Sequence, residues 1–502
     1  MQGRARAWNN KGYGDAGASY RKRALKGFKA SSGSAQEDID FNNYTMRQRA
    51  RMLYMAAPLA TSAIKTNRTN VIGPGLTLTA KVDRDLLGMS PEAADAWQRT
   101  AEKEFAVWAE NRQACDATGL NDFYEIQQLT LTAWLLSGDS FCLFKSGAKS
   151  AVNPYDLCLH LIEADRIATP STANFVKYGQ LTEGKADNGN KIHDGVEVNA
   201  SGRVMAYHIR NTYPYSVTDD VTEWKRIEAV GKSTGMPNIL HIMEAERPDQ
   251  YRGISYLAQV IEPLLQIRRY TETEITAATI ESCFAGFIKT EARTDEVPMN
   301  ETGPEDTSEA SDPDEFNFGP GEYNVLKPGE DIVFSDPKRP ANGFGAFVRA
   351  MAEQIGAALE IPADLLLKAF NASYSASRGA LLEAWKAFRM RRAWFAKDFC
   401  GPVYEAWLAE AVAIGRIKAP GFFTDPRIRK AYSGNEWTGP SQGQLDPAKE
   451  IAGEILAVQH GFSTHEQSTA RLNGGNWRDN VEKLKREQQE LAAVQKGVTN
   501  NE

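Results

Sequence analysis

The N-terminal part of the chain alternates between helical and strand-like patterns of apolar residues. Within residues 43–70 the apolar positions at helical spacing are Met46, Ala50, Leu53, Ala57 and Ile64. They predict a helix that Pro58 breaks or kinks. Residues 76–80 alternate as a half-buried strand does. Ser90 followed by Pro91 predicts the start of the next helix, because proline fits the first helical position.

A further helix is expected over residues 122–136, followed by strand-rich runs over 140–167 and 195–242. Together with the preceding elements, these runs predict one mixed α+β module over residues 40–245. We therefore assign the chain to the α+β class.

From Ile254 the pattern changes to long helices. One is expected to run to Cys283, and a second from Phe344 to Leu359, ending before Pro362. Between them, residues 323–326 and 331–334 are predicted to be strands around the turn at 327–330.

A polar loop over 368–377 precedes the longest helical pattern, whose apolar face is Leu381, Trp385, Phe388, Phe395 and Phe399. Gly401 and Pro402 should interrupt this helix, and residues 403–414 resume it. The last segment opens at Asp446, contains a predicted capping box of Ser463 and Glu466, and ends in a polar tail.

The composition indicates a folded protein of several modules. The chain has 502 residues, of which 25% are charged and 42% hydrophobic. No apolar run reaches membrane-spanning length and no signal peptide is recognisable, so we expect a cytosolic protein that binds no membrane. The cysteines, expected to be buried free thiols, are Cys115, Cys142, Cys158, Cys283 and Cys400.

Charge is distributed unevenly around a formal total of −7. Residues 1–30 are rich in lysine and arginine and predict a basic, flexible arm. Residues 291–315 are acidic and contain three prolines, which predicts a poorly ordered excursion. The net charge argues against a protein that grips nucleic acid over its whole surface.

The motifs that resemble enzyme sites are incomplete. Gly231-Lys232-Ser233 lacks the upstream glycine of a phosphate-binding loop. Gly138-Asp139-Ser140 resembles a nucleophile elbow, but Cys142 stands where the closing glycine belongs, so we expect a surface turn. The histidines show no metal-binding spacing. We therefore predict no catalytic residue, no metal and no cofactor; a cryptic hydrolase using Ser140 is the enzymatic alternative.

Two groups of polar residues remain as candidate sites. The loop residues Lys368, Asn371, Ser373, Tyr374 and Ser375 have no evident packing role, and such loops often carry function. The second group is Arg389, Arg391 and Arg392. These arginines form either a solvated or salt-bridged helix face or contacts to DNA or another subunit, and as a recognition helix they would suit a DNA-binding regulator. The aromatic stripe of the same helix is expected to be core rather than a base-stacking surface.

The order of these elements resembles that of tailed-phage portal proteins of the lambda type. The resemblance covers residues 40–490. Its motifs are the segment from Asn67 to Gly75, the Arg252-Gly253 segment before the first long helix, the run from Tyr374 to Trp385, the run from Phe399 to Leu408, and Gly461 to Thr464.

The resemblance implies a portal fold with the following division. An arm over 1–40 precedes a wing domain over 41–252, a first stem helix over 253–284, a clip over 285–340, a second stem helix over 341–362, a tunnel loop over 363–378, a long wing helix and wing segment over 379–440, a crown over 441–490 and a tail over 491–502.

By the same resemblance, the protein is a non-enzymatic subunit of a closed ring, usually of twelve copies, at one vertex of the virion. Double-stranded DNA passes through the ring during packaging and ejection, and the tunnel loop faces the channel. The clip docks the large terminase subunit and then head-tail adaptor proteins, and major capsid and scaffolding proteins surround the ring during assembly in the host cytoplasm. The clip candidates are Glu301, Glu305, Asp306, Asp312 and Asp314.

Overall fold

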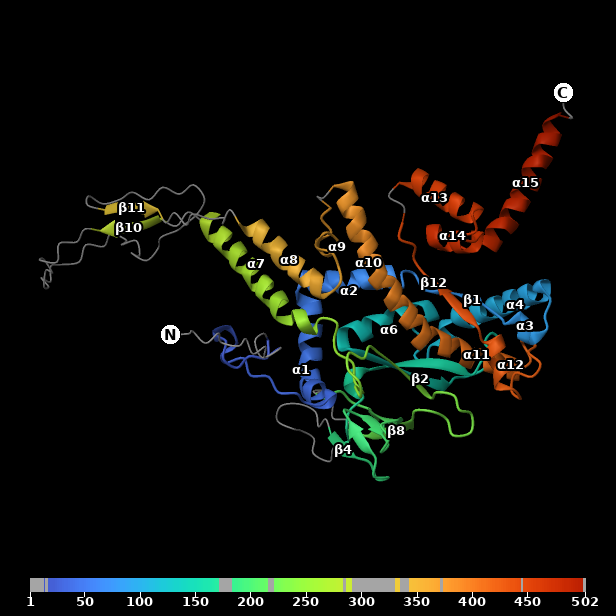
Figure 1. Ribbon diagram of the computed structural model, residues 1–502, viewed down its shortest axis with the longest axis horizontal. Helices are drawn as coiled ribbons and strands as arrows, with labels where there is room; N and C mark the ends of the chain where they lie inside the picture. The colour runs from blue at the N-terminus through green and yellow to red at the C-terminus, as the bar shows by residue number, and fades with distance from the viewer. Residues whose placement is uncertain are drawn as a thin grey trace, which may run out of the picture.

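The computed structural model describes residue 13 and residues 17–170, 183–214, 221–282, 286–290, 330–334, 343–370, 373–443 and 446–499. The long helices come before residue 138 or after residue 260, and most of the described strands lie between residues 139 and 243 (Figure 1). This arrangement confirms a mixed helix and sheet protein.

The helices begin and end close to the residues that their capping signals indicate. In chain order, they are α1 (Ala35–Ala56), α2 (Pro58–Val71), α3 (Arg84–Leu87), α4 (Pro91–Ala109), α5 (Arg112–Cys115), α6 (Phe123–Ser137), α7 (Ile261–Ser282), α8 (Phe344–Ala358), α9 (Ala363–Leu367), α10 (Tyr374–Phe395), α11 (Gly401–Ala413), α12 (Pro426–Tyr432), α13 (Pro447–Gln459), α14 (His465–Asn473) and α15 (Trp477–Thr499). Short 3-10 helices cover Arg23–Leu25, Ala164–Arg166 and Ala258–Val260.

Within the part of the chain that the structure describes, the strands form four small antiparallel groups. β2 (Asp139–Ser146) lies between β3 (Leu157–Glu163) and β9 (Ile239–Met243). A second sheet has five strands in sequence order: β4 (Glu183–Lys185), β5 (Lys191–His193), β6 (Val196–Val198), β7 (Val204–Arg210) and β8 (Trp224–Glu228). The other two groups are pairs, β1 (Thr77–Ala80) with β12 (Asn435–Thr438) and β10 (Gly286–Thr290) with β11 (Glu330–Phe334).

The main core joins residues from both ends of the chain. Phe105 of α4 contacts Trp407 of α11 edge to face, with ring centroids 5.1 Å apart. Phe123 of α6 stacks on Phe399, at 5.9 Å, in the π-helical turn between α10 and α11. This contact fixes the C-terminal helices on the N-terminal module and confirms that the aromatic stripe of α10 is core.

Several boundary predictions are confirmed. Pro58 separates α1 from α2, and Pro91 starts α4 with the Ser90 hydroxyl accepting from the Ala93 amide. The interruption predicted at Gly401 and Pro402 is a π-helical turn over Ala396–Cys400. The four cysteines in the described residues, Cys115, Cys142, Cys158 and Cys400, are buried free thiols; Cys283 lies outside them.

The first long helix starts later than predicted, at Ile261 and not at Ile254. Residues 254–257 are held instead by the end of α6, where the Tyr256 amide donates to the Leu135 carbonyl at 2.9 Å. Pro263 lies in the first turn of α7, where its missing N–H costs no helical hydrogen bond. The strand predicted at 323–326 lies outside the described residues, and β11 pairs with β10.

The predicted capping box of Ser463 and Glu466 is wrong by one residue. Thr464 caps α14: its hydroxyl accepts from the Gln467 amide and the Gln467 side chain accepts from the Thr464 amide. Ser463 is buried and bonds Ser468 instead. The expected tail is helical as far as Thr499, because strong helix formers continue α15 beyond residue 490.

Candidate functional site: a helical arm and the charged network at its base

Helices α7 and α8 lie side by side and project from the body as a two-helix arm, with the β10–β11 pair beyond its outer end (Figure 1). Tyr270 of α7 holds them together: its ring stacks on Phe344 at 5.6 Å and meets Phe347 edge to face at 4.9 Å. The arm is buried only near its base. Farther out, Ile275 is 61% exposed and Phe347 is 47% exposed.

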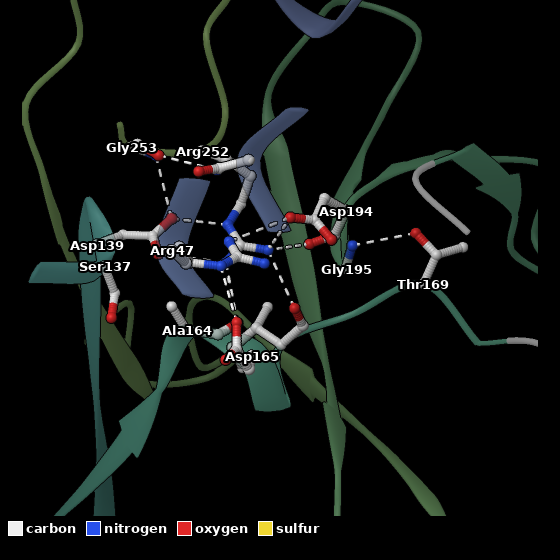
Figure 2. A network of polar contacts seen from close by, with 12 residues as sticks. Arg47, Ser137, Asp139, Ala164, Asp165, Thr169, Asp194, Gly195, Arg252 and Gly253 are labelled. Atoms are coloured by element: carbon white, nitrogen blue, oxygen red, sulfur yellow. Dashed lines mark hydrogen bonds and ion pairs between the residues drawn. The ribbon is translucent and has the colours of Figure 1, made fainter. Parts of the chain in front are cut away.

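Arg252 anchors the segment that leads into this arm. Its side chain is fully buried, and Figure 2 shows it at the centre of a polar network. Its Nε lies 2.7 Å from Asp139 Oδ2, and its Nη1 lies 2.7 Å from Asp194 Oδ2. The same guanidinium donates to the backbone carbonyls of Ala164 and Ile167, each at 3.0 Å. One side chain therefore joins the arm to both sheets of the body.

Helix α1 contributes a second buried arginine to the network. Arg47 Nε lies 2.8 Å from Asp165 Oδ1, and Arg47 Nη1 lies 3.5 Å from Asp194 Oδ2 (Figure 2). Asn43, one turn earlier, donates from Nδ2 to the Gly253 carbonyl at 2.9 Å. Because Asp194 faces both arginines, the network behaves as one unit.

The electrostatics of the network are strongly perturbed. Burial tends to raise the pKa of Asp139, but Arg252 and hydrogen bonds outweigh it, so that this pKa lies well below its usual range. The pKa of Asp40 is raised to about 7, mainly by burial and then by Asp194, against the opposing effect of Arg252 and Arg47. Asp139 is therefore ionised at neutral pH, while Asp40 holds a proton in the folded protein below about pH 7.

We expect Asp40→Asn to reduce the pH dependence of stability. The folded-state pKa lies above the ordinary value of 3.8, so the free energy of unfolding should fall as the pH rises from about 4 to about 7. Each pH unit in this window corresponds to about 1.4 kcal/mol. Denaturant unfolding at pH 5 and pH 8 should therefore show the wild type losing roughly 2.5 kcal/mol more than the variant. Equal losses would contradict the assigned pKa.

The backbones of Gly253 and Gly138 touch at the point where the arm segment crosses the end of α6. Gly138 ends α6 with φ +88°, a left-handed conformation that suits glycine. A Cβ atom on Gly253 would lie 1.8 Å from the Gly138 carbonyl oxygen. Only glycine fits there. Because Gly253 directly follows Arg252, this close crossing also places the Arg252 side chain in its network.

The segment from Gly138 to Ser140 is buried, and the surface turn that we predicted there is wrong. Asp139 is fully buried against Arg252 and Ser140 is 1% exposed. The Ser140 hydroxyl has no hydrogen-bond partner among the described residues. A buried hydroxyl beside an arginine-paired carboxylate is unsuited to attack an external substrate, which disfavours the hydrolase alternative.

Helices occupy both ends of the range 363–378, which we expected to form the tunnel loop. Its first part is α9, and its last part is the start of α10, which Ser373 caps through the Ala376 amide. Lys368 ends α9 at φ +57°, and its Nζ donates to Thr66 Oγ1 of α2 at 2.8 Å. Burial lowers the pKa of Lys368. Its side chain is thus turned to the body.

The other loop candidates remain untested as channel residues. Ser373 and Ser375 are exposed, Tyr374 is the first residue of α10, and Asn371 lies outside the described residues. The clip candidates also lie outside the described residues: Glu301, Glu305, Asp306, Asp312 and Asp314.

Two of the three candidate arginines on α10 are used inside the subunit. Arg391 is buried and bonds Asn67 and Glu360 at 3.1 and 2.6 Å. Arg392 donates to the backbone carbonyls of three residues, Asn70, Val71 and Pro440. The salt-bridged alternative therefore describes Arg391, and backbone hydrogen bonds hold Arg392. Arg389 is exposed, with a long contact of 3.4 Å to Gln442.

Within the described ranges, no group of three or more histidine, cysteine or acidic side chains is arranged to hold a metal ion. No described helix has the length and apolar character of a membrane span.

Sequence reasoning missed the buried network. The sequence did contain two indications of it: Asp139 stands directly before an apolar strand, and Arg252 directly precedes a glycine. The residues that pair in the network are up to two hundred positions apart, so the sequence pattern did not connect them.

Comparison with known proteins gives consistent matches. The family model described as phage portal protein, lambda family, matches residues 21–392. The portal protein of Escherichia phage N15 is 22% identical over 94% of this chain and 88% of its own length. Portal protein B of Escherichia phage lambda is 21% identical over 82% of this chain and 77% of its own.

Among solved structures, similar chains come from the neck of gene transfer agent particles. In the native neck the match covers 86% of this chain and 93% of the other, with 14% identity and a TM-score of 0.41. In the empty particle it covers 85% and 92%, with 14% identity and a TM-score of 0.44.

Proposed function

Because the chain belongs to the lambda family of phage portal proteins, we propose that it assembles into a closed ring, of about twelve copies, that conducts double-stranded DNA. In this proposal the arm of α7 and α8 is the stem, β10 and β11 belong to the clip, α9 and the start of α10 form the tunnel loop, and α13 to α15 form the crown. The clip docks the terminase motor and later the head-tail adaptor proteins.

The projecting arm is the observation that supports this assignment most directly. A pair of helices with exposed Ile275 and Phe347 is poorly covered within one chain. Neighbouring arms in a ring would cover these side chains and would enclose a passage along the arms. The network at Arg252 would hold each arm at a constant angle to its body, as a ring of identical subunits requires.

The net charge of −7 is also suited to a channel through which DNA must slide. Protein contacts that neutralise phosphates add affinity for each lysine or arginine used. Two candidate cations, Arg391 and Arg392, are committed to the interior of the subunit. A passage with few free cations would bind the duplex weakly and let it move.

The test is the size and shape of the purified full-length protein. We expect rings with a central hole wide enough for duplex DNA in negative-stain electron microscopy, and a mass of about twelve subunits by light scattering. A persistent monomer or dimer at all salt and protein concentrations would overturn the ring proposal.

A further inference from the structure

Helix α13 presents apolar side chains to solvent and turns its two glutamates, Glu450 and Glu454, to the rest of the protein. Ile451 is 41% exposed, Ile455 is 51% exposed and Leu456 is 54% exposed. Phe462, in the loop that follows, is 85% exposed. An amphipathic helix on an isolated soluble subunit normally has the reverse orientation.

The inward side of α13 is held by ion pairs. Glu450 lies 3.6 Å from Arg378 of α10, and its side chain is 21% exposed. Glu454 lies 2.7 Å from Arg471 of α14 and also accepts from the Ser468 hydroxyl at 2.8 Å. These contacts fix the rotation of α13 about its axis. Its apolar face therefore cannot turn inward without breaking them.

Helix α15 carries a second uncovered apolar stripe. Along one side of α15, residues recur at steps of four and three, and all of them except Gln488 are apolar: Trp477, Val481, Leu484, Gln488 and Leu491. This repeat is typical of a helix that packs along another helix. Leu484 is 52% exposed and Leu491 is 62% exposed.

The two faces cannot cover each other within one subunit. The base of α15 is fixed on α4, where Arg478 pairs with Asp95 at 2.7 Å, and from there α15 points away from the body (Figure 1). Within one chain Leu484 and Ile455 each remain about half exposed, so neither residue is covered in the single subunit.

We infer that the apolar face of α13 in one copy is covered by α15 of the next copy. This inference rests on the proposed function, because it assumes a ring. The faces match in length: Ala448 to Ile455 and Leu484 to Leu491 each span seven residues, about 10 Å at 1.5 Å per residue. They match in character, because Ala448, Ile451 and Ile455 of α13 and Leu484 and Leu491 of α15 are all apolar.

The contact joins two different surfaces, so each added copy exposes the same α15 again and the series can close into a ring. A nucleic acid is not a suitable occupant, because the one cation of α13, Lys449, pairs with Asp446 at 2.9 Å and the apolar side chains offer nothing to phosphates. Burying leucine and isoleucine side chains in this way contributes stability through the hydrophobic effect.

Disulfide cross-linking of the full-length protein tests the contact directly. With Ile455→Cys and Leu484→Cys in the same chain, mild oxidation should give a ladder of covalent oligomers on a non-reducing gel, because a disulfide requires Cα atoms within about 7 Å. Either single variant and the wild type should give none. The matched control combines Ile455→Cys with Gln489→Cys, which places the second thiol away from the stripe.

The outcomes separate this inference from the ring itself. Rings in the microscope with no more ladder than the Gln489→Cys control would overturn the α13–α15 contact and leave the ring standing. A cross-link confined to the monomer would also overturn it. Absence of wild-type rings would instead overturn the proposed function.

A second pair of variants adds no cysteine. Leu484→Asp should reduce the fraction of protein in rings at least tenfold at a fixed concentration, and Gln489→Asp should leave it unchanged. Both residues are exposed in the single subunit, so neither substitution should unfold it. Equal ring fractions for the two variants would overturn the inference.

Discussion

Replacing Arg252 with methionine is expected to destabilise the subunit by about 3 to 5 kcal/mol, the range for removing one partner of a buried ion pair. The variant would leave the carboxylates of Asp139 and Asp194 buried without their shared cation. The backbone carbonyls that Arg252 satisfies would lose their donors as well. The measurement is denaturant unfolding followed by tryptophan fluorescence, at matched protein concentration.

Arg247→Met is the matched control. Arg247 also ties this segment to α1, through Asp38, but both side chains are about half exposed. Its loss should cost below about 1 kcal/mol, as exposed ion pairs do. Adding Asp139→Asn to Arg252→Met should recover part of the lost stability, because one unpaired charge is removed. A similar cost for Arg247→Met and Arg252→Met would show that the network is not the anchor of the arm.

Gly253→Ala is expected to cost at least about 3 kcal/mol, the upper end of the typical cost of overpacking. The added Cβ would lie 1.8 Å from the backbone oxygen of Gly138, and a backbone atom cannot swing aside as a long side chain can. The crossing would have to open, and the Arg252 contacts would lengthen with it. Thermal and denaturant unfolding both measure the effect.

Gly345→Ala is the matched control: it is the same substitution, but it is expected not to destabilise the protein. Gly345 lies in the first turn of α8 with no atom within 4 Å of its added Cβ. Alanine should therefore leave stability unchanged or raise it by up to about 1 kcal/mol through helix propensity. If Gly253→Ala were as mild as Gly345→Ala, the close crossing of the two backbones would be wrong.

The candidate loop shows why local sequence pattern predicted only part of the site. Lys368 was expected in a polar loop without a packing role, yet its ammonium group reaches Thr66 on a helix three hundred residues earlier. Arg391 likewise reaches Asn67. Nothing in the local spacing around either residue specifies these partners, because they are set by how α2 packs under α9 and α10.

The sequence by itself determined many of the elements and several of their ends, although α1 starts at Ala35, before the predicted residue 43. Proline and glycine act through the backbone of their own neighbourhood, so Pro58 and Pro91 could be placed without knowledge of the fold. The burial of the aromatic stripe on α10 followed from helical periodicity, and the family resemblance followed from short motifs.

Only the tertiary structure decided which polar residues are buried together and which apolar residues are left outside. Arg47, Asp139, Asp194 and Arg252 meet because four separate segments converge at the base of the arm. The outward apolar face of α13 depends on ion pairs from two other helices. Whether a charged residue is buried in an ion pair or an apolar residue is left exposed depends on contacts between segments far apart in the sequence. Those contacts are set by the packing of the helices and sheets.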